Sequence, residues 1–198
     1  MSTPLHFSNT SQNVWFKLEF NQFTGSFKER GARYTLLTLM NLDGFDKTKG
    51  VVAASAGNHA LALAYHGGLL GIKITVVMPD VAPLAKVDKC RLLGANVIIK
   101  GGHIGESKIH AEKLVKTDGL TYVNGYDDKT ICAGAGTVGM EIIEQGERER
   151  VMMSLSLSTL GNDVRVALGA ASGRWLPRTS SMQQCTDLPG QHRSVGPI

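Results

Sequence analysis

A lysine in the first turn of an expected helix is the residue of this chain best suited to covalent chemistry. Residues 24–34 read TGSFKERGARY, in which Ser26 precedes Glu29 by three positions, a pattern typical of a capped helix start. Lys28 then lies near the positive end of the helix dipole, which lowers the pKa of its amine, and burial would lower that pKa further. Such an amine can form a Schiff base with an aldehyde. The alternative is an ordinary lysine that faces solvent.

A second group of polar residues stands where an expected strand gives way to a helix. Residues 54–60 read ASAGNHA, and the helix is expected to begin near Asn58. Free backbone N–H groups at such a turn bind anions, and the side chains of Ser55, Asn58 and His59 add donors. The turn is therefore a candidate site for a carboxylate or a phosphate. A plain strand-to-helix turn with an asparagine cap is the alternative.

The elements that must position these residues alternate between strand and helix. Short β-branched apolar runs predict strands, and amphipathic runs that end at glycine predict helices. The expected strands cover 50–56, 72–79, 96–100 and 120–124, and the expected helices cover 58–71, 83–95, 105–119 and 131–145. Alternating units of this kind predict an α/β fold built on a parallel sheet.

Composition limits the class of protein. The chain has 198 residues, of which 42% are hydrophobic and 19% charged, as is typical of a globular protein. Its net charge of +4 gives no reason to expect a nucleic-acid or membrane partner. No apolar run is long enough to span a bilayer and the start does not resemble a signal peptide, so we expect a cytoplasmic location. The widely spaced Cys90, Cys132 and Cys185 predict reduced thiols and no zinc site.

Two further patterns are interpreted structurally. Residues 134–139, GAGTVG, match the glycine spacing of a dinucleotide-binding loop, but they do not directly follow a strand. We therefore interpret these glycines as positions of close helix packing. His103 and His110 could share a helix face, but no third ligand accompanies them and we expect no metal site there.

The chain changes character after Gln145. Residues 146–198 contain no lysine and six arginines, whereas residues 1–145 contain twelve lysines and three arginines. The later segment is rich in serine, glycine, proline and glutamine, a composition typical of disorder. We expect it to be a tail that is unrelated to the preceding units.

The two polar motifs together resemble the threonine dehydratase and serine racemase family. TGSFKERGA and ASAGNHA stand in the family's order, together with TPL at 3–5, VVMP at 76–79 and AGAGT at 133–137. The resemblance implies the cofactor pyridoxal 5'-phosphate and an incomplete form of the two-domain fold known as fold type II. The implied division is a partial large domain with the cofactor lysine at 1–49, a small α/β domain for the substrate carboxylate at 50–128, a helix returning to the large domain at 129–145, and a tail outside the family at 146–198.

The resemblance also implies roles for individual residues. Lys28 would hold the cofactor as a Schiff base, and Phe27 would lie against the cofactor ring. Asn58 would reach the phenolic oxygen of the cofactor as well as the substrate. The residues implied to bind the substrate carboxylate are Ser55, Gly57, Asn58 and His59.

One position bears on the reaction. Racemases of the family have a second serine in the turn as an acid/base, and this chain has Ala56 there. We therefore expect dehydration and deamination of L-threonine or L-serine to a 2-oxo acid and ammonia, in an enzyme that, like many of its family, is homo-oligomeric. The glycine-rich loop with which the family grips the cofactor phosphate is not matched after Gln145. A truncated inactive isoform, or pseudoenzyme, is therefore the alternative.

Overall fold

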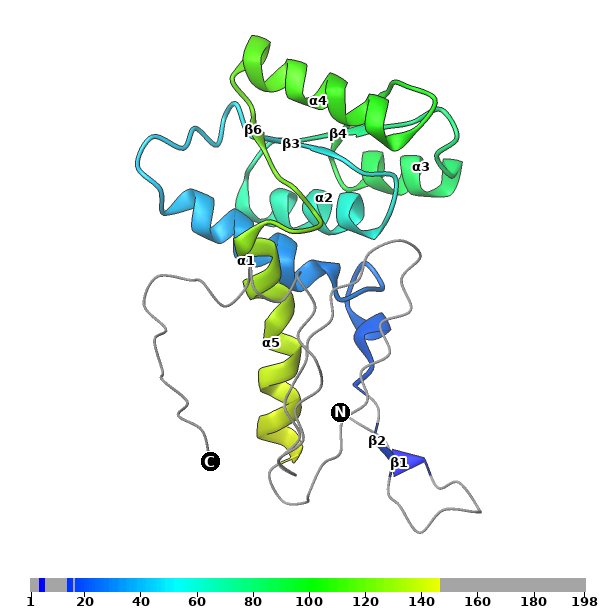
Figure 1. The fold of residues 1–198 in the computed structure, drawn as a ribbon, viewed down its shortest axis with the longest axis vertical. Helices are drawn as coiled ribbons and strands as arrows, with labels where there is room; N and C mark the ends of the chain where they lie inside the picture. Colours follow the sequence, from blue (N-terminus) through cyan, green and yellow to red (C-terminus); the bar gives the residue numbers. More distant parts are fainter. Residues whose placement is uncertain (1–3, 6–13, 16, 147–198) are drawn as a thin grey trace, which may run out of the picture.

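A four-stranded parallel sheet is the centre of the computed structural model, which describes residues 4–5, 14–15 and 17–146 (Figure 1). Its strands are β3 (Val51–Ala54), β4 (Ile74–Met78), β5 (Asn96–Ile99) and β6 (Thr121–Tyr122). They lie in the order β5-β4-β3-β6, and every neighbouring pair is parallel. The predicted α/β fold with a parallel sheet is confirmed.

Helices cover both faces of this sheet. Helix α4 (Ile104–Asp118) lies on one face, and α2 (Asn58–Leu70) and α3 (Leu84–Leu92) lie on the other (Figure 1). Helices α1 (Lys28–Met40) and α5 (Lys129–Gly146) pack against each other beyond α2. The remaining elements are the antiparallel pair β1 (Pro4–Leu5) and β2 (Val14–Trp15), and a 3-10 helix, η1 (Glu19–Asn21).

Strand β3 explains why a continuous apolar run predicts a buried strand. Because successive side chains of a strand point to opposite faces, Val51 and Ala53 join the core formed with α2, whereas Val52 and Ala54 join the core beneath α4. All of β3 is buried. A strand covered on both faces has no polar side to alternate with, so its sequence reads as uniformly apolar.

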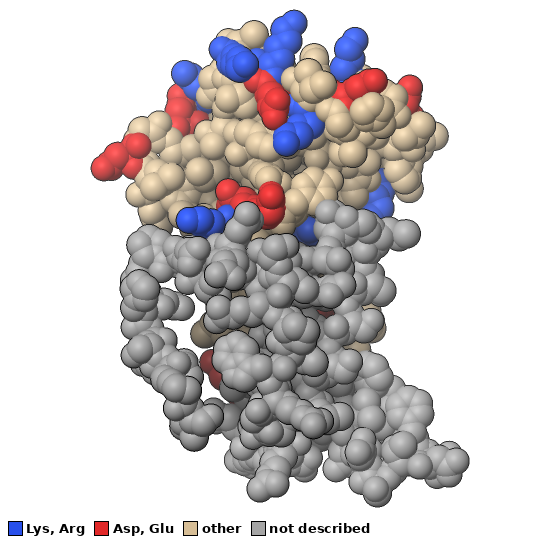
Figure 2. All heavy atoms as spheres, in the orientation of Figure 1, with Lys and Arg blue, Asp and Glu red and all other residues tan. Residues whose placement is uncertain are grey.

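The charged side chains on one face of the described residues are mixed in sign. On the face shown in Figure 2, lysine and arginine lie among aspartate and glutamate over the α4 end of the molecule. Among the helices that the structure describes, none combines the length and the apolar character that a membrane span needs. The predicted tail at 146–198 lies, apart from Gly146, outside the described residues, and the proposed domain boundaries stay predictions.

Gly31 on α1 and Gly134 on α5 lie where the two helices are in close contact. A Cβ atom on Gly134 would lie 2.6 Å from the carbonyl oxygen of Arg30 and 2.8 Å from the Cα of Gly31. No atom of the described part of the chain lies within 4 Å of the corresponding position on Gly136. The interpretation of the GAGTVG glycines as packing positions is therefore confirmed for Gly134, while Gly136 faces open space.

This difference predicts opposite effects of two substitutions that lie only two positions apart. Gly134→Ala should lower the free energy of unfolding by about 1–3 kcal/mol, because backbone atoms of α1 must move to admit the methyl group. Gly136→Ala should raise it by about 0.5–1 kcal/mol, because alanine loses less conformational entropy in a helix. Urea unfolding followed by circular dichroism measures both. Equal effects would contradict the close helix contact.

Candidate active site

The predicted site residues gather where the strand order of the sheet reverses. From β3 the chain adds β4 and then β5 on one side, and β6 joins the other side of β3. The turn at 55–57 and the loop at 123–128 therefore leave the sheet at neighbouring carboxyl ends. In open α/β sheets, ligands bind in the crevice at this point of reversal.

Lys28 reaches this end of the sheet from α1. Its side-chain amine donates a 2.8 Å hydrogen bond to the carbonyl oxygen of Gly125, in the loop after β6. Lys28 is 9% exposed, so the alternative of a solvent-facing lysine is wrong. Burial lowers the pKa of its amine, and the nearby Cys132 thiol opposes that change. The Nζ atom lies 5.4 Å from the ring centroid of Phe27 and 5.9 Å from that of Tyr126.

The start of α1 is fixed partly as the sequence predicts. The Oγ of Ser26 accepts a 3.1 Å hydrogen bond from the backbone N–H of Lys28. The cap position itself is Phe27, whose side chain makes no capping hydrogen bond, so the predicted cap at Ser26 is wrong by one residue. The second half of the capping pattern is wrong, because Glu29 does not turn back to Ser26. Its Oε1 instead accepts hydrogen bonds from the backbone N–H of Thr24 and, at 2.8 Å, from the Thr24 hydroxyl.

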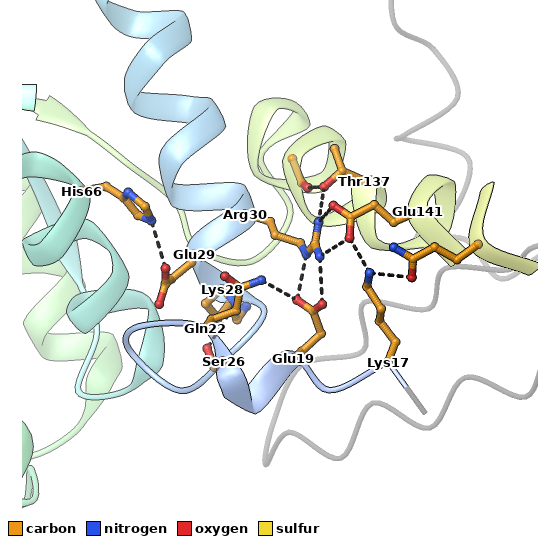
Figure 3. Close-up of polar contacts among 12 residues, drawn as sticks. Lys17, Glu19, Gln22, Ser26, Lys28, Glu29, Arg30, His66, Thr137 and Glu141 are labelled. Atoms are coloured by element: carbon orange, nitrogen blue, oxygen red, sulfur yellow. Dashed lines mark hydrogen bonds and ion pairs between the residues drawn. The ribbon is translucent and has the colours of Figure 1, made fainter. Parts of the chain in front are cut away.

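The other oxygen of Glu29 joins α1 to α2. Its Oε2 lies 3.2 Å from Nε2 of His66, and both side chains are buried (Figure 3). Desolvation lowers the pKa of His66, although the Glu29 carboxylate opposes the change, so the imidazole is neutral at pH 7 and donates Nε2–H. Glu29 thus ties the residues before Lys28 to the helix that carries Asn58.

Arg30 holds the segment before α1 against α5. Its guanidinium lies 2.7 Å from a carboxylate oxygen of Glu19 and 2.6 Å from one of Glu141 (Figure 3). Lys17 adds a 2.6 Å ion pair to the same Glu141. Hydrogen bonds from Arg30, and then from Lys17, lower the pKa of Glu141 to about 2. The network therefore fixes the direction in which α1 presents Lys28.

The turn after β3 leaves the start of α2 without a side-chain cap. Gly57, not Asn58, occupies the cap position, and among the described residues no side chain bonds to the first backbone N–H groups of the helix. The alternative of an asparagine cap is wrong. Ser55 accepts a 3.3 Å hydrogen bond from the N–H of Gly57, and Asn58 is the first residue of the helix. The backbone donors that an anion site requires are thus not taken by a cap.

His59 is packed into the site and almost fully buried. A Cβ on Gly125 would lie 2.4 Å from Cδ2 of the ring, so the ring lies directly against that glycine. Burial and then the charge of Lys28 lower the pKa of His59 to about 4, while the Val123 backbone opposes this. Neither ring nitrogen makes a hydrogen bond of normal geometry to the described part of the chain. His59 and Lys28 therefore meet through the same residue, Gly125.

The structure brings the predicted residues to one place and adds others that were not predicted. Sequence reasoning missed Gly125, Tyr126, the Glu29–His66 pair and Lys86, whose amine contacts Asn58. Lys86 alone carried a usable signal, since it stands in the first turn of a helix, as Lys28 does. Within the described ranges, no group of three or more metal-ligating side chains is assembled.

A separate hollow of about 640 Å³ lies beside α1. Its lining includes Glu29, Arg30, Tyr34, Tyr65 and His66, but none of Lys28, Phe27, Asn58 or His59. Several aromatic and aliphatic side chains are exposed around it, among them Phe23 and Leu69. This hollow is therefore distinct from the candidate active site.

A buried amine beside an uncapped strand-to-helix turn, at the reversal point of a parallel sheet, fits the class of enzyme that holds an aldehyde cofactor on a lysine. Comparison with known families agrees with this class. The family model described as "Pyridoxal-phosphate dependent enzyme" matches residues 2–183. The chain belongs to this family, and the predicted cofactor is the cofactor of the family.

Particular proteins of known name are similar to this chain in sequence and in structure. The chain is 47% identical over 135 residues to the "L-threonine dehydratase catabolic TdcB" of Staphylococcus aureus strain N315, covering 68% of this chain and 38% of that protein. It matches threonine deaminase isoform 2 of Solanum lycopersicum with a TM-score of 0.62 and 40% identity, over 67% of this chain and 36% of that one. For serine racemase of Dictyostelium discoideum the TM-score is 0.61 and the identity 33%, over 68% and 43%. The predicted resemblance and fold type II are confirmed, and the chain spans less than half the length of each of these proteins.

Burial of His59 predicts a loss of stability in acid. Its pKa is about 4 in the folded chain, against 6.5 for an unperturbed histidine, so the unfolded chain binds more protons between these values. Stability should therefore fall as the pH drops from about 6.5 to about 4, by about 3 kcal/mol from this group. Urea unfolding at several pH values measures the slope.

The matched variants are His59→Asn, which should lose most of this slope, and His103→Asn, which alters an exposed histidine at the start of α4 and should keep it. His66 contributes a change of the same sign, so some slope should remain in both variants. An undiminished slope in His59→Asn would contradict the assignment.

Proposed function

We propose that this chain holds pyridoxal 5'-phosphate on Lys28 and takes part in the deamination of L-threonine or L-serine to a 2-oxo acid and ammonia. The observation that carries the proposal is the buried amine of Lys28, whose pKa is lowered, at the reversal point of the sheet. Membership of the family and the similarity to proteins named threonine dehydratase and threonine deaminase support it.

The residues present fit such a cofactor. A buried amine is the group that captures an aldehyde, and the rings of Phe27 and Tyr126 lie beside it for contact with a flat aromatic ligand. Asn58 and the uncapped start of α2 offer donors to anionic oxygens. When bound, the cofactor supplies an electron sink for the charge left at the substrate Cα.

The side chains of this chain then have distinct tasks. Lys28, which would hold the cofactor, would also take the proton from the substrate Cα, and a lowered pKa suits this role of base. Ser55, Gly57, Asn58 and His59 bind and orient the substrate carboxylate through the turn. Burial around Phe27 and His59 excludes water from the reacting atoms. The proposal includes a small amino-acid substrate, a homo-oligomer, a cytoplasmic location and no nucleic-acid or membrane partner.

A second candidate is a chain that binds without turnover. The sequence after Gln145 lacks a run like the glycine-rich loop with which the family grips the cofactor phosphate. This observation favours an inactive isoform or pseudoenzyme, which would keep the amine of Lys28 without turning over an amino acid. The two candidates differ in one measurable respect, which is the production of 2-oxo acid.

Trapping and turnover together test the proposal. The chain incubated with pyridoxal phosphate and then reduced with borohydride should gain the mass of one cofactor, located on Lys28 by peptide mapping. L-threonine should then yield 2-oxo acid, and Lys28→Ala should lose both signals. Lys89→Ala, which removes an exposed lysine, is the control and should keep both. An adduct without 2-oxo acid would establish the inactive alternative, and no adduct on Lys28 would refute cofactor binding.

Ala56 predicts the stereochemical outcome. Because the turn lacks a second hydroxyl to protonate the opposite face of Cα, incubation with L-serine should give pyruvate and no D-serine. Chiral chromatography of the reaction mixture measures both products. D-serine from the wild-type chain at a rate comparable with that of pyruvate would show that another group supplies the second proton. Ala56→Ser tests whether a hydroxyl at this position is sufficient to add racemisation.

A further inference from the structure

Lys86 makes a short hydrogen bond to the one asparagine of the proposed site. Its Nζ lies 2.6 Å from Oδ1 of Asn58, and the pair is partly buried. Lys86 comes from α3, whereas Asn58 is the first residue of α2, so the bond joins two different helices at the end where the site lies. A contact of this length is typical of a charge-assisted hydrogen bond.

The chemistry of the two groups decides how the amide is oriented. A lysine ammonium has three donors and no acceptor, so the amide atom that faces it must be the oxygen. The amide of asparagine is planar, so binding of Oδ1 turns Nδ2 and its two N–H donors away from Lys86.

The position of Lys86 in its helix is electrostatically unfavourable for a cation. It lies in the first turn of α3, where the helix dipole disfavours a cation, whereas the other cations of that helix, Lys89 and Arg91, lie in the favourable last turn. Lys86 is also less exposed than Lys89. The bond to Asn58 is therefore the feature that accounts for a cation at this place.

We propose that Lys86 is a positioning residue that fixes the amide of Asn58 so that Nδ2 is the donor offered to an anionic oxygen in the site. The oxygen belongs either to the substrate carboxylate or to the phenolic group of the cofactor, and this part rests on the proposed function. The orientation itself is a property of the chain alone, so it can be tested without either ligand.

The first experiment observes the amide directly in the protein without cofactor. In proton–nitrogen correlation spectra of the labelled full chain, the side-chain resonances of Asn58 are identified by their loss in Asn58→Ala. Lys86→Met should shift them, because it keeps the length of the side chain and removes the donor. Lys86→Arg should leave them close to the wild-type positions, and Lys89→Met is the matched control. Unchanged resonances in Lys86→Met would overturn the proposal.

The second experiment measures what the fixed amide does for binding. Lys86→Met should weaken binding of pyridoxal phosphate or of L-serine about 10-fold, the scale of one hydrogen bond to a charged group. Asn58→Ala should lose a similar factor, and the double variant should lose no more than either single variant, because both remove the same interaction. Weaker binding of the cofactor identifies the phenolic oxygen, and weaker binding of serine alone identifies the carboxylate.

The outcomes separate this inference from the proposed function. If the wild-type chain binds no pyridoxal phosphate, the proposed function fails, while the resonances of Asn58 still decide the orientation. If the losses in the single variants multiply in the double variant, Lys86 acts independently of Asn58 and the inference fails. The thermal unfolding temperature of Lys86→Met should match that of Lys89→Met to within about 2 °C, whereas a purely structural role of Lys86 would lower it selectively.

Discussion

The hydrogen bond from Lys28 to the carbonyl of Gly125 is the contact on which the arrangement of the site depends. It joins the first turn of α1 to the loop after β6, between residues that lie 97 positions apart in the sequence. An amine in this position is desolvated, so its pKa falls, and it must be held by an acceptor that carries no full charge. A carbonyl meets that need, whereas a carboxylate would favour the charged amine and raise its pKa.

The close packing of α1 on α5 at two glycines brings Lys28 within reach of the Gly125 carbonyl. Gly31 and Gly134 let α1 lie directly on α5, which follows from the loop that carries Gly125. Gly125 in turn lies against the ring of His59, so the turn after β3 and the loop after β6 share one packed surface. The position of Lys28 relative to the turn is thus set by backbone contacts, which have less freedom than long side chains.

The sequence predicted the parts of this structure that depend on local physics. The strands of the sheet and α2–α5 could be predicted because the period of apolar residues reports which face of an element is buried. The role of Ser26 at the start of α1 could be predicted in part, because the backbone N–H that it binds lies only two residues away, although Phe27 is the cap residue. The partner of Glu29 could not be predicted, since a local rule assigned it to the helix start, whereas the fold brings His66 from another helix. The role of Gly125 as the acceptor for Lys28 could not be predicted either, because it depends on β6 lying beside β3 in the sheet.

Two lysines in first turns show how an unfavourable local position can indicate function. Each pays a small electrostatic cost against its own helix dipole, and each is bound by an uncharged oxygen, the carbonyl for Lys28 and the amide for Lys86. The two lysines differ in burial. Lys28 is buried and its pKa is lowered, whereas Lys86 is only partly buried. The first arrangement suits an amine that must react, and the second suits a cation that must stay in place and orient its neighbour. Burial therefore separates the chemical role from the positioning role, a distinction that the position in the helix alone does not make.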